Sequence, residues 1–565
     1  MRVLGAYGRG CIAKAGMALA LTFGVSTPLI AQQVPDPILE EERRRQLEQR
    51  TNELGTLERR GGAPDPGPAQ ARGGPCFQIN RLTVEGVSLL SPEELAAITS
   101  KYVPNCMQGA DIQAVMRELD AAYADQGYIT SKTYISPQNL QDGELVLTML
   151  EGTVEDILLI DAEQQIESKR GERQLKTAFP NAEGELFQLR DFEQGLDQMN
   201  RLASVEAILK LQPGEEPGGS YVIVQRVQED RVRGYARLDN QGSESTGRNK
   251  LSFDLEVDDL FGANDAWTFG YSGSENTNAL SINGSVPYGY WTFETELAYS
   301  EYLTPLNALS ELFGTSRTAG LKARYVAHRD QTSTTELNFG LRVRKSDRFI
   351  NDVRLTPQNL STFSLGVKHL RLGEKARNSY DATLTFGTTL FGADKDAPGI
   401  GSDIPRAQFF KINAGWQRQG ALGQTGTLVT DLRAQWSPHT LYGTEQLSLG
   451  SFSTVRGYEA SIATGDMGVY MRNDLYLAPN IWNFLPEEAA GKIANKTQTH
   501  LFLDMGITRD HARDVTEKAA GFGLGLSYYH KRFTLSGTVG VPLIEDNSFG
   551  IGDPVFQVRM DVKTW

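Results

Sequence analysis

The sequence is poor in the residues on which metal and nucleophile chemistry depend. Its 565 residues include three cysteines and six histidines, and the histidines are scattered between His328 and His530. A structural zinc ion needs four Cys or His ligands close together, so no metal site is expected. The motifs GxSxG, HExxH and GxxxxGK(S/T) are also absent. These absences argue against an enzyme and against a nucleotide-driven machine, and they predict no cofactor.

Long apolar runs and an excess of basic charge are missing as well. Beyond residue 31, no stretch offers 18 uncharged apolar residues, which a transmembrane helix would need. A mature chain that crosses a membrane must therefore do so as a closed β-barrel, because lipid cannot satisfy open backbone groups. The formal net charge of −14 argues against nucleic acid as the main partner, since phosphate binding needs a concentrated basic face.

The N-terminal segment has the features of a secretory signal peptide. Basic residues precede a short apolar stretch at residues 15–25, and Leu29 and Ala31 fit a cleavage site. A retained membrane helix is the alternative, but the apolar stretch is short and Pro28 follows it closely. We predict a signal peptide over residues 1–31.

Cys76 and Cys106 are the two cysteines that would remain after cleavage. Export would place them in an oxidising compartment, where an even pair favours a disulfide over a metal site. Closing a loop of this size would contribute on the order of 3 kcal/mol to stability. We therefore expect a structural disulfide between them.

A polar helix is predicted next, over residues 32–60. Asp36 and Pro37 make a good helix start, and acidic residues follow near the positive end of the helix dipole. The segment has few apolar side chains, so it could not bury much surface in a core. Two interpretations stay open: a solvated or partly disordered helix, or a plug about 33 Å long that suits a wet lumen. Residues 61–75, rich in Gly and Pro, are predicted to form a flexible linker.

The rest of the chain divides by its pattern of apolar residues. Residues 76–152 and 153–229 each show a strand, two helical segments and two further strands, which predicts two small α+β domains. Residues 230–565 alternate apolar and polar positions, as in the run Leu251–Val257. A soluble β-sandwich shows the same alternation, but about 330 residues of it behind a signal peptide favour an outer-membrane barrel of about 16 strands.

The most informative pair of residues lies in this last region. In the segment Leu501–Gly506, apolar residues alternate with Phe502, Asp504 and Gly506, so one face would meet lipid and the other a lumen. Asp504 then points inward and needs a cationic partner, for which Arg456 is the best-matched candidate. The alternative is that Arg456 is a solvated loop residue and Asp504 a charge that lines the lumen. An enclosed pair suggests a membrane transporter rather than an enzyme.

Several motifs, in order along the chain, resemble those of one family. The first set comprises Cys76 to Ile79, Cys106, Gly127 and Tyr128 with the following Ile129-Thr130-Ser131, Gly143, and Glu151-Gly152. It resembles the first POTRA domain of the TpsB family, the outer-membrane transporters of two-partner secretion. Asp239 to Gly242, Thr246-Gly247 and Pro287 to Trp291 are similar to the opening of that family's barrel. Val455, Arg456, Gly457 and Tyr458 resemble the tip of its sixth extracellular loop, and Phe502, Asp504 and Gly506 its strand motif.

The resemblance implies a transmembrane β-barrel of about 16 antiparallel strands in the outer membrane of a Gram-negative bacterium. Two periplasmic POTRA domains and an N-terminal plug helix would precede it. The POTRA domains would capture one large secreted partner, a TpsA-like exoprotein of the adhesin or haemolysin type, by adding its strand to a sheet edge. Outer-membrane lipid is the other implied partner, and nucleotide and nucleic acid are not.

For the site, the resemblance implies that Arg456 pairs with Asp504 inside the barrel. Gly457 and Tyr458 would shape the turn, and Phe502 would pack beside it. A barrel-assembly insertase of the wider POTRA-barrel superfamily is the alternative function. Its members generally carry more POTRA domains and lack the polar helix before the first one.

Overall fold

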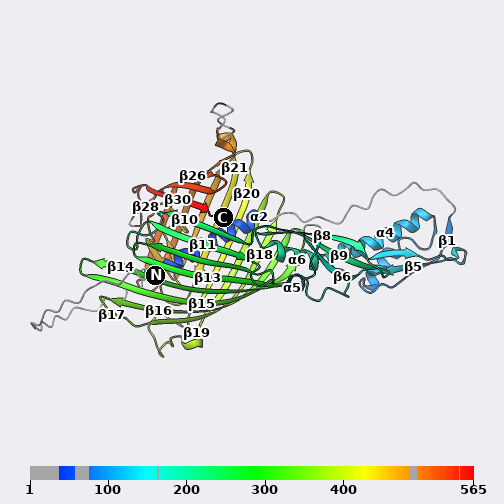
Figure 1. Ribbon diagram of the computed structural model, residues 1–565, viewed down its shortest axis with the longest axis horizontal. Helices are drawn as coiled ribbons and strands as arrows, with labels where there is room; N and C mark the ends of the chain where they lie inside the picture. Colours follow the sequence, from blue (N-terminus) through cyan, green and yellow to red (C-terminus); the bar gives the residue numbers. More distant parts are fainter. Residues whose placement is uncertain are drawn as a thin grey trace, which may run out of the picture.

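The computed structural model describes residues 37–56, 76–161, 164–482, 486, 491, 493–545 and 547–564. It consists of a closed β-barrel, two α+β domains in a row at one end of the barrel, and a helix within the barrel (Figure 1). The predicted signal peptide, residues 1–31, and the predicted linker, residues 61–75, lie outside the described residues. Within the described part of the chain, no helix combines the length and the apolar character needed to cross a bilayer.

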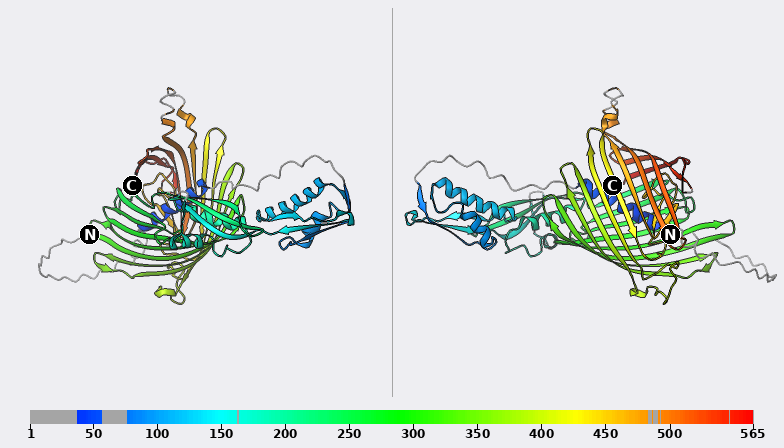
Figure 2. Two further views of the ribbon diagram at one scale, coloured as in Figure 1. Left: turned by 45° about the vertical axis from the view of Figure 1, so that its right-hand side comes forward. Right: turned by 180° about the vertical axis from the view of Figure 1, so that it is seen from behind.

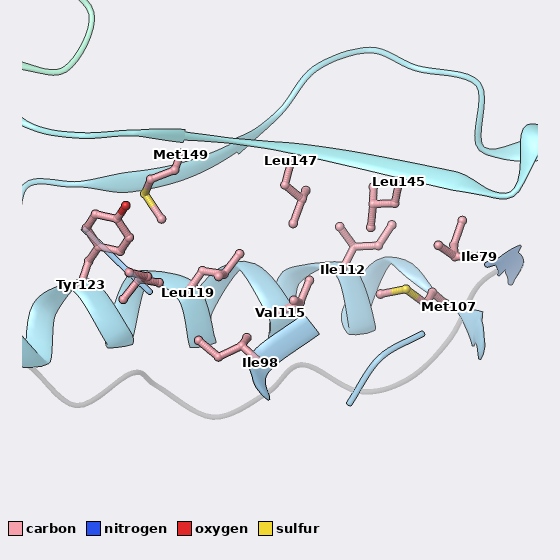
Figure 3. Close-up of a cluster of buried hydrophobic side chains, with 11 residues drawn as sticks. Ile79, Ile98, Met107, Ile112, Val115, Leu119, Tyr123, Leu145, Leu147 and Met149 are labelled. Atoms are coloured by element: carbon pink, nitrogen blue, oxygen red, sulfur yellow. The ribbon is translucent and has the colours of Figure 1, made fainter. Parts of the chain in front are cut away.

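The first α+β domain has a core formed by two helices and a small sheet. Its elements are β1 (Phe77–Ile79), β2 (Arg81–Glu85), α3 (Pro92–Thr99), β3 (Asn105–Met107), α4 (Gly109–Asp125), β4 (Lys132–Ile135), η1 (Leu140–Asp142) and β5 (Glu144–Leu150). Strand β5 lies between β2 and β4, and β1 pairs with β3. Figure 3 shows α4 along the sheet, with Val115, Leu119 and Tyr123 on the side that faces Leu145 and Leu147. All five side chains are fully buried.

Local sequence signals explain these helices. The Ser91 hydroxyl accepts a hydrogen bond from the Glu94 N–H, and the Glu94 carboxylate accepts one from the Ser91 N–H at 2.9 Å. Pro92 takes the first helical position, where a missing N–H costs no bond. Hydrogen bonds from the Ser91 hydroxyl and N–H lower the pKa of the Glu94 carboxyl. In α4, the buried side chains at positions 112, 115, 119 and 123 recur at helical spacing, which gives the helix one apolar face.

The second α+β domain lies between the first domain and the barrel (Figure 1). Its elements are β6 (Thr153–Asp161), β7 (Gln164–Gln165), α5 (Lys169–Ala178), α6 (Leu189–Asn200), β8 (Val205–Pro213) and β9 (Gly219–Gln228). The sheet order is β7-β6-β9-β8, with β6 and β9 parallel. Phe187 stacks on Phe192 at a centroid distance of 4.8 Å, and Phe179 lies 5.3 Å from the same ring. These rings fill the space between the helices and the sheet.

Sixteen antiparallel strands close the barrel, as predicted. They are β10 (Val232–Asp239), β11 (Lys250–Asp258), β12 (Ala266–Ser274), β13 (Thr277–Tyr288), β14 (Trp291–Asn307), β15 (Ser310–Arg329), β16 (Ser333–Ile350), β18 (Gln358–Leu372), β19 (Ala376–Thr388), β20 (Phe410–Leu422), β21 (Gly426–Trp436), β24 (Met467–Leu477), β25 (Thr497–Asp510), β26 (Val515–Tyr529), β27 (Phe533–Pro542) and β30 (Val555–Lys563). The first strand, β10, pairs with the last, β30, to complete the ring.

Short elements lie in the connections between barrel strands. They are β17 (Val353–Arg354), η2 (Leu390–Gly392), β22 (Leu447–Leu449), β23 (Ala463–Gly465), η3 (Pro479–Trp482), β28 (Ile544–Glu545) and β29 (Ser548–Phe549). Strands β22 and β23 pair with each other within the long connection between β21 and β24. This connection, residues 437–466, is called the inner loop below.

The helix α2 (Pro37–Thr56) lies inside the barrel and crosses it obliquely (Figure 2). Its described side chains form ion pairs with lumen-facing residues of several strands. The structure thus places a large part of the predicted 32–60 helix in the lumen rather than in solvent outside the barrel. Of the two interpretations of this polar segment, the lumen helix is the one observed.

Candidate functional site

The inner loop folds back into the barrel and is buried there. Leu449 and Val455 of this loop have no exposed surface, and Tyr458 is 8% exposed. They pack with Tyr470 of β24 and Ala519 of β26 in a small apolar cluster against the wall. The loop therefore belongs to the protein interior, although it connects two strands at the end of the barrel away from the α+β domains.

Arg456 at the tip of the inner loop binds Asp504 of β25. The guanidinium Nε donates to Asp504 Oδ2 at 2.7 Å, and Nη2 donates to Oδ1 at 2.9 Å. The Arg456 backbone N–H donates to Oδ2 at 3.1 Å. Arg456 is 3% exposed and Asp504 has no exposed surface. This fork-to-fork pair is the strong, geometrically selective kind of ion pair.

Two further groups complete the environment of Arg456. Asp474 of β24 accepts a third charged hydrogen bond, from Nη1, at 2.6 Å. The Phe502 ring lies 4.0 Å from the guanidinium carbon, in cation–π geometry. Asp474 was not predicted from the sequence. The available signal was only its position two residues from Arg472 and from Tyr476, which puts all three on one face of β24.

Gly457 and Tyr458 fit the loop tip closely to the inner wall. Gly457 has φ of +105°, and a Cβ there would come within 3.0 Å of the Val541 carbonyl. The Tyr458 hydroxyl lies 2.9 and 2.8 Å from the carbonyl oxygens of Ala520 and Ile544, which share its single proton. The glycine at position 457 can adopt this positive φ, and the Tyr458 hydroxyl bonds to the wall. Together they hold the loop tip against the last strands.

Glycines of the wall make room for the same tip, and the sequence did not single them out. A Cβ at Gly521 of β26 would lie 2.0 Å from the Arg456 carbonyl oxygen, and one at Gly540 of β27 would lie 2.9 Å from Gly457 Cα. At Gly506, which the sequence did single out, a Cβ would come within 2.8 Å of the Leu449 side chain. The wall is therefore shaped for the backbone of this loop.

Asp466 holds the base of the inner loop. Its Oδ1 accepts from the Leu441 N–H at 2.7 Å, and its Oδ2 accepts from the His511 N–H at 2.7 Å. The carboxylate has no exposed surface. It joins the two ends of the loop to the next connection along the barrel.

The helix α2 contacts the lumen wall mainly through charged groups. Glu42 accepts from Arg342 at 3.2 Å and from Arg344 at 2.9 Å, both on β16. Arg45 donates to Ser281 at 3.0 Å and to Asp254 at 3.3 Å. Further contacts join Glu48 to Arg559, Arg50 to Asp431, and Arg43 to Ser448 of the inner loop. The helix and the loop therefore share the lumen and touch through Arg43.

The predicted residues of the first α+β domain occupy two places in it. Cys76 and Cys106 form a disulfide between the segments of β1 and β3, with a Cα–Cα distance of 5.4 Å. Gly127, with φ of +97°, lies at the junction with the second domain, where its carbonyl accepts from the Leu189 N–H at 2.9 Å. Tyr128 packs edge-on to Tyr123 of α4. The disulfide and the Gly127 turn are therefore separate from the lumen site.

The second α+β domain docks on the strand connections at its end of the barrel. Gln174 of α5 donates to Asp259 at 2.6 Å, and Gln198 of α6 donates to the Gly289 carbonyl at 3.0 Å. Arg329 of β15 donates to Asp197 of α6 at 2.6 Å. These polar contacts orient the domain over the mouth of the lumen, and no sequence motif had indicated them.

The barrel, the paired α+β domains and the occupied lumen define a class of membrane transporter, and comparison with known proteins identifies the family. Residues 218–528 match the family described as haemolysin secretion/activation protein ShlB/FhaC/HecB. Residues 77–152 match a ShlB-type POTRA domain, and residues 153–213 match a second POTRA domain model.

Known relatives agree in sequence and in structure. The outer membrane transporter CdiB of Dickeya dadantii (strain 3937) is 31% identical over 485 residues, which is 83% of each chain. The hemolysin transporter protein ShlB of Serratia marcescens is 31% identical over 497 residues, covering 82% of this chain and 86% of the relative. The solved structure of CdiB from Escherichia coli has a TM-score of 0.82 at 27% identity, covering 94% of this chain and 99% of that one.

The chain belongs to the ShlB/FhaC/HecB family, the TpsB transporters of two-partner secretion. It is an outer-membrane pore that exports a partner exoprotein, with its POTRA domains in the periplasm. The end of the barrel that carries these domains is therefore periplasmic, and the inner loop starts from the extracellular end. The findings support the transporter over the insertase that the sequence had left as the alternative.

Proposed function

We propose that α2 is a removable plug, which fills the lumen at rest and leaves it when the exoprotein passes. The observation that carries this proposal is the chemistry of its contacts. Among the described residues of α2, Leu39 is the one buried apolar side chain and none belongs to an apolar cluster, while hydrogen bonds and ion pairs link the helix to the wall. Such groups regain hydrogen bonds in water when they separate, so departure of the helix exposes little apolar surface.

The inner loop has the opposite role in this proposal. Arg456, gripped by Asp504 and Asp474, stays in place and keeps the loop against the wall while the lumen empties. Val455, Gly457, Tyr458, Phe502 and Gly506 serve this fit and take no part in chemistry. The chain is accordingly a transporter without a catalytic step.

The POTRA domains, for which we propose the boundaries 76–152 and 153–229, receive the exoprotein before it enters the barrel at 230–565. The partner would be a large exported protein of the adhesin or haemolysin type, captured in extended form at a sheet edge. The docking of the second domain on the barrel turns supports a direct path from this capture to the lumen.

The test is to tether α2 to the wall. Cysteines replace Arg45 and Ser281, whose side chains are 3.0 Å apart, and a photocleavable thiol cross-linker joins them in the folded protein. We expect export of the exoprotein encoded beside this chain to fall below about a tenth and to recover on illumination, because a tethered helix cannot vacate the pore.

Two controls complete this test. Each single-cysteine variant, treated with the same linker, should export normally. The linker is cleaved by light, so Cys76 and Cys106 remain oxidised throughout. Normal export with the tether intact would show that the exoprotein does not need the space that α2 occupies.

A further inference from the structure

The seam where the barrel closes has the shortest strand ladder of the wall. The seam between β10 and β30 has five pairs of directly opposed residues, from Tyr235 with Lys563 to Asp239 with Arg559. Every other adjacent pair among the sixteen strands has at least eight. At the extracellular end the Asn240 side chain bonds to the backbone of Phe556 and Val558, and the Asn240 N–H donates to the Val558 carbonyl at 3.2 Å.

Charged side chains of both strands face the lumen across this seam. Arg237 of β10 lies directly opposite Asp561 of β30 and donates to it at 2.7 Å. Arg559 of β30 donates to the same carboxylate at 2.7 and 3.0 Å. Two guanidinium groups therefore share the Asp561 carboxylate, and the second carboxylate of the seam, Asp239, lies directly opposite Arg559 in the ladder.

Glu48 of α2 adds a carboxylate that reaches arginines of both strands. Its Oε1 accepts from Arg559 at 2.8 Å and lies 3.9 Å from Arg237. The same oxygen accepts from Arg44 of α2 at 2.8 Å, which directs the carboxylate. One carboxylate of the lumen helix thus bridges the first and the last strand.

We propose that α2 is also the clasp of the barrel seam, with Glu48 tying β10 to β30. When the helix leaves, Arg237 and Arg559 lose this shared carboxylate across the shortest ladder of the barrel. Departure of the plug therefore empties the lumen and at the same time weakens the seam between β10 and β30. The clasp itself is a property of the resting protein, and only its use during export rests on the plug function proposed above.

The chain offers a matched control within the same helix. Glu42 also bridges two arginines, Arg342 and Arg344, at 3.2 and 2.9 Å. Both of these arginines are on β16, whose ladders with β15 and β18 are among the longest. Removing the Glu42 charge weakens the binding of α2 to the lumen wall through a similar number of contacts. It leaves the charges at the seam unchanged.

Hydrogen exchange of the full-length protein in lipid nanodiscs tests the clasp without any export. In Glu48→Gln, we expect amides of β10 and β30 to exchange roughly three- to tenfold faster, while β14 and β15 stay unchanged. In Glu42→Gln, the seam should change less than twofold. A chain lacking residues 37–56 should exchange at the seam at least as fast as Glu48→Gln.

Equal seam exchange in Glu48→Gln and Glu42→Gln, or none above the unmodified protein in Glu48→Gln, would overturn the proposal. If the shortened chain does not assemble, the two point variants decide alone. A failure here would leave the tethering result intact, since that experiment reports on export and this one on the resting wall.

Discussion

The barrel holds two segments in its lumen, and they are held by opposite kinds of contact. In the inner loop, Leu449 and Val455 are completely buried. Carboxylates on two strands of the wall hold its Arg456, which is 3% exposed. The plug helix α2 touches the wall through charged side chains, most of them partly accessible, such as Arg45 at 26% and Glu48 at 38%; its Glu42–Arg344 pair is more enclosed, at 15% and 5%.

This difference separates a part built to stay from a part built to leave. Partly exposed ion pairs contribute roughly 0 to 1 kcal/mol each, because water can replace the partner. Breaking a buried pair costs about 3 to 5 kcal/mol, because one charge stays behind without a partner. Both members of the buried pair Glu41–Arg44 belong to the helix and would travel together, whereas the longer contact of Glu41 with Lys250 of β11, at 3.9 Å, would be broken.

The largest expected effect comes from cutting the loop's anchor. Arg456→Ala leaves Asp504 and Asp474 buried without their cation, at a cost of about 3 to 5 kcal/mol. We expect the inner loop to leave the wall and export to stop, while the barrel remains inserted. Protease sensitivity of the loop in whole cells, heat-modifiability on gels and a secretion assay measure these three outcomes.

The matched control for Arg456 is Arg513→Ala. Arg513 also pairs with two carboxylates, Asp510 and Glu517, but its side chain is 31% exposed at the extracellular rim. We expect this variant to export nearly as well as the unmodified chain. Normal export by Arg456→Ala would remove the distinction between the two lumen segments.

A smaller effect is expected from a single methyl group at the loop tip. Gly457→Ala forces a non-glycine residue to a φ of +105° and places its Cβ 3.0 Å from the Val541 carbonyl. We expect the free energy of unfolding of the purified protein, followed by thermal denaturation, to fall by about 1 to 3 kcal/mol. Gly399→Ala, at φ of +72° with nothing within 4 Å, isolates the backbone term and should cost less. Equal losses would mean that the wall contact contributes nothing.

The smallest expected effect is a difference between α2 and the inner loop in how they respond to salt. Raising the salt concentration from about 0.05 to 0.5 M shortens the Debye length from roughly 14 to 4 Å and should weaken the contacts of α2. A cysteine at the exposed Gln46 should then react a few-fold faster with a membrane-impermeant thiol reagent. A cysteine at the buried Ser453 of the inner loop should not change. Parallel changes at both sites would contradict the contrast in how they are held.

The sequence predicted Arg456 and Asp504 because the alternation around Asp504 depends only on neighbouring residues. It missed Asp474, although this carboxylate makes the 2.6 Å bond to the same guanidinium. Nothing local distinguishes Asp474 from other charges of the lumen, since its role depends on where the loop tip comes to rest. Gly521 and Gly540 escaped notice for the same reason: a missing side chain has meaning only where another backbone approaches.

The sequence by itself determined the alternating strands, the two α+β domains, the cysteine pair and the polar character of α2, because each follows from short-range periodicity or composition. The tertiary structure decided that α2 lies in the lumen, that Glu48 meets Arg237 and Arg559, and that the second POTRA domain docks on the barrel turns. These are contacts between residues up to 511 positions apart. They exist because closing the ring brings the first and last strands together around one helix, and no local pattern encodes that meeting.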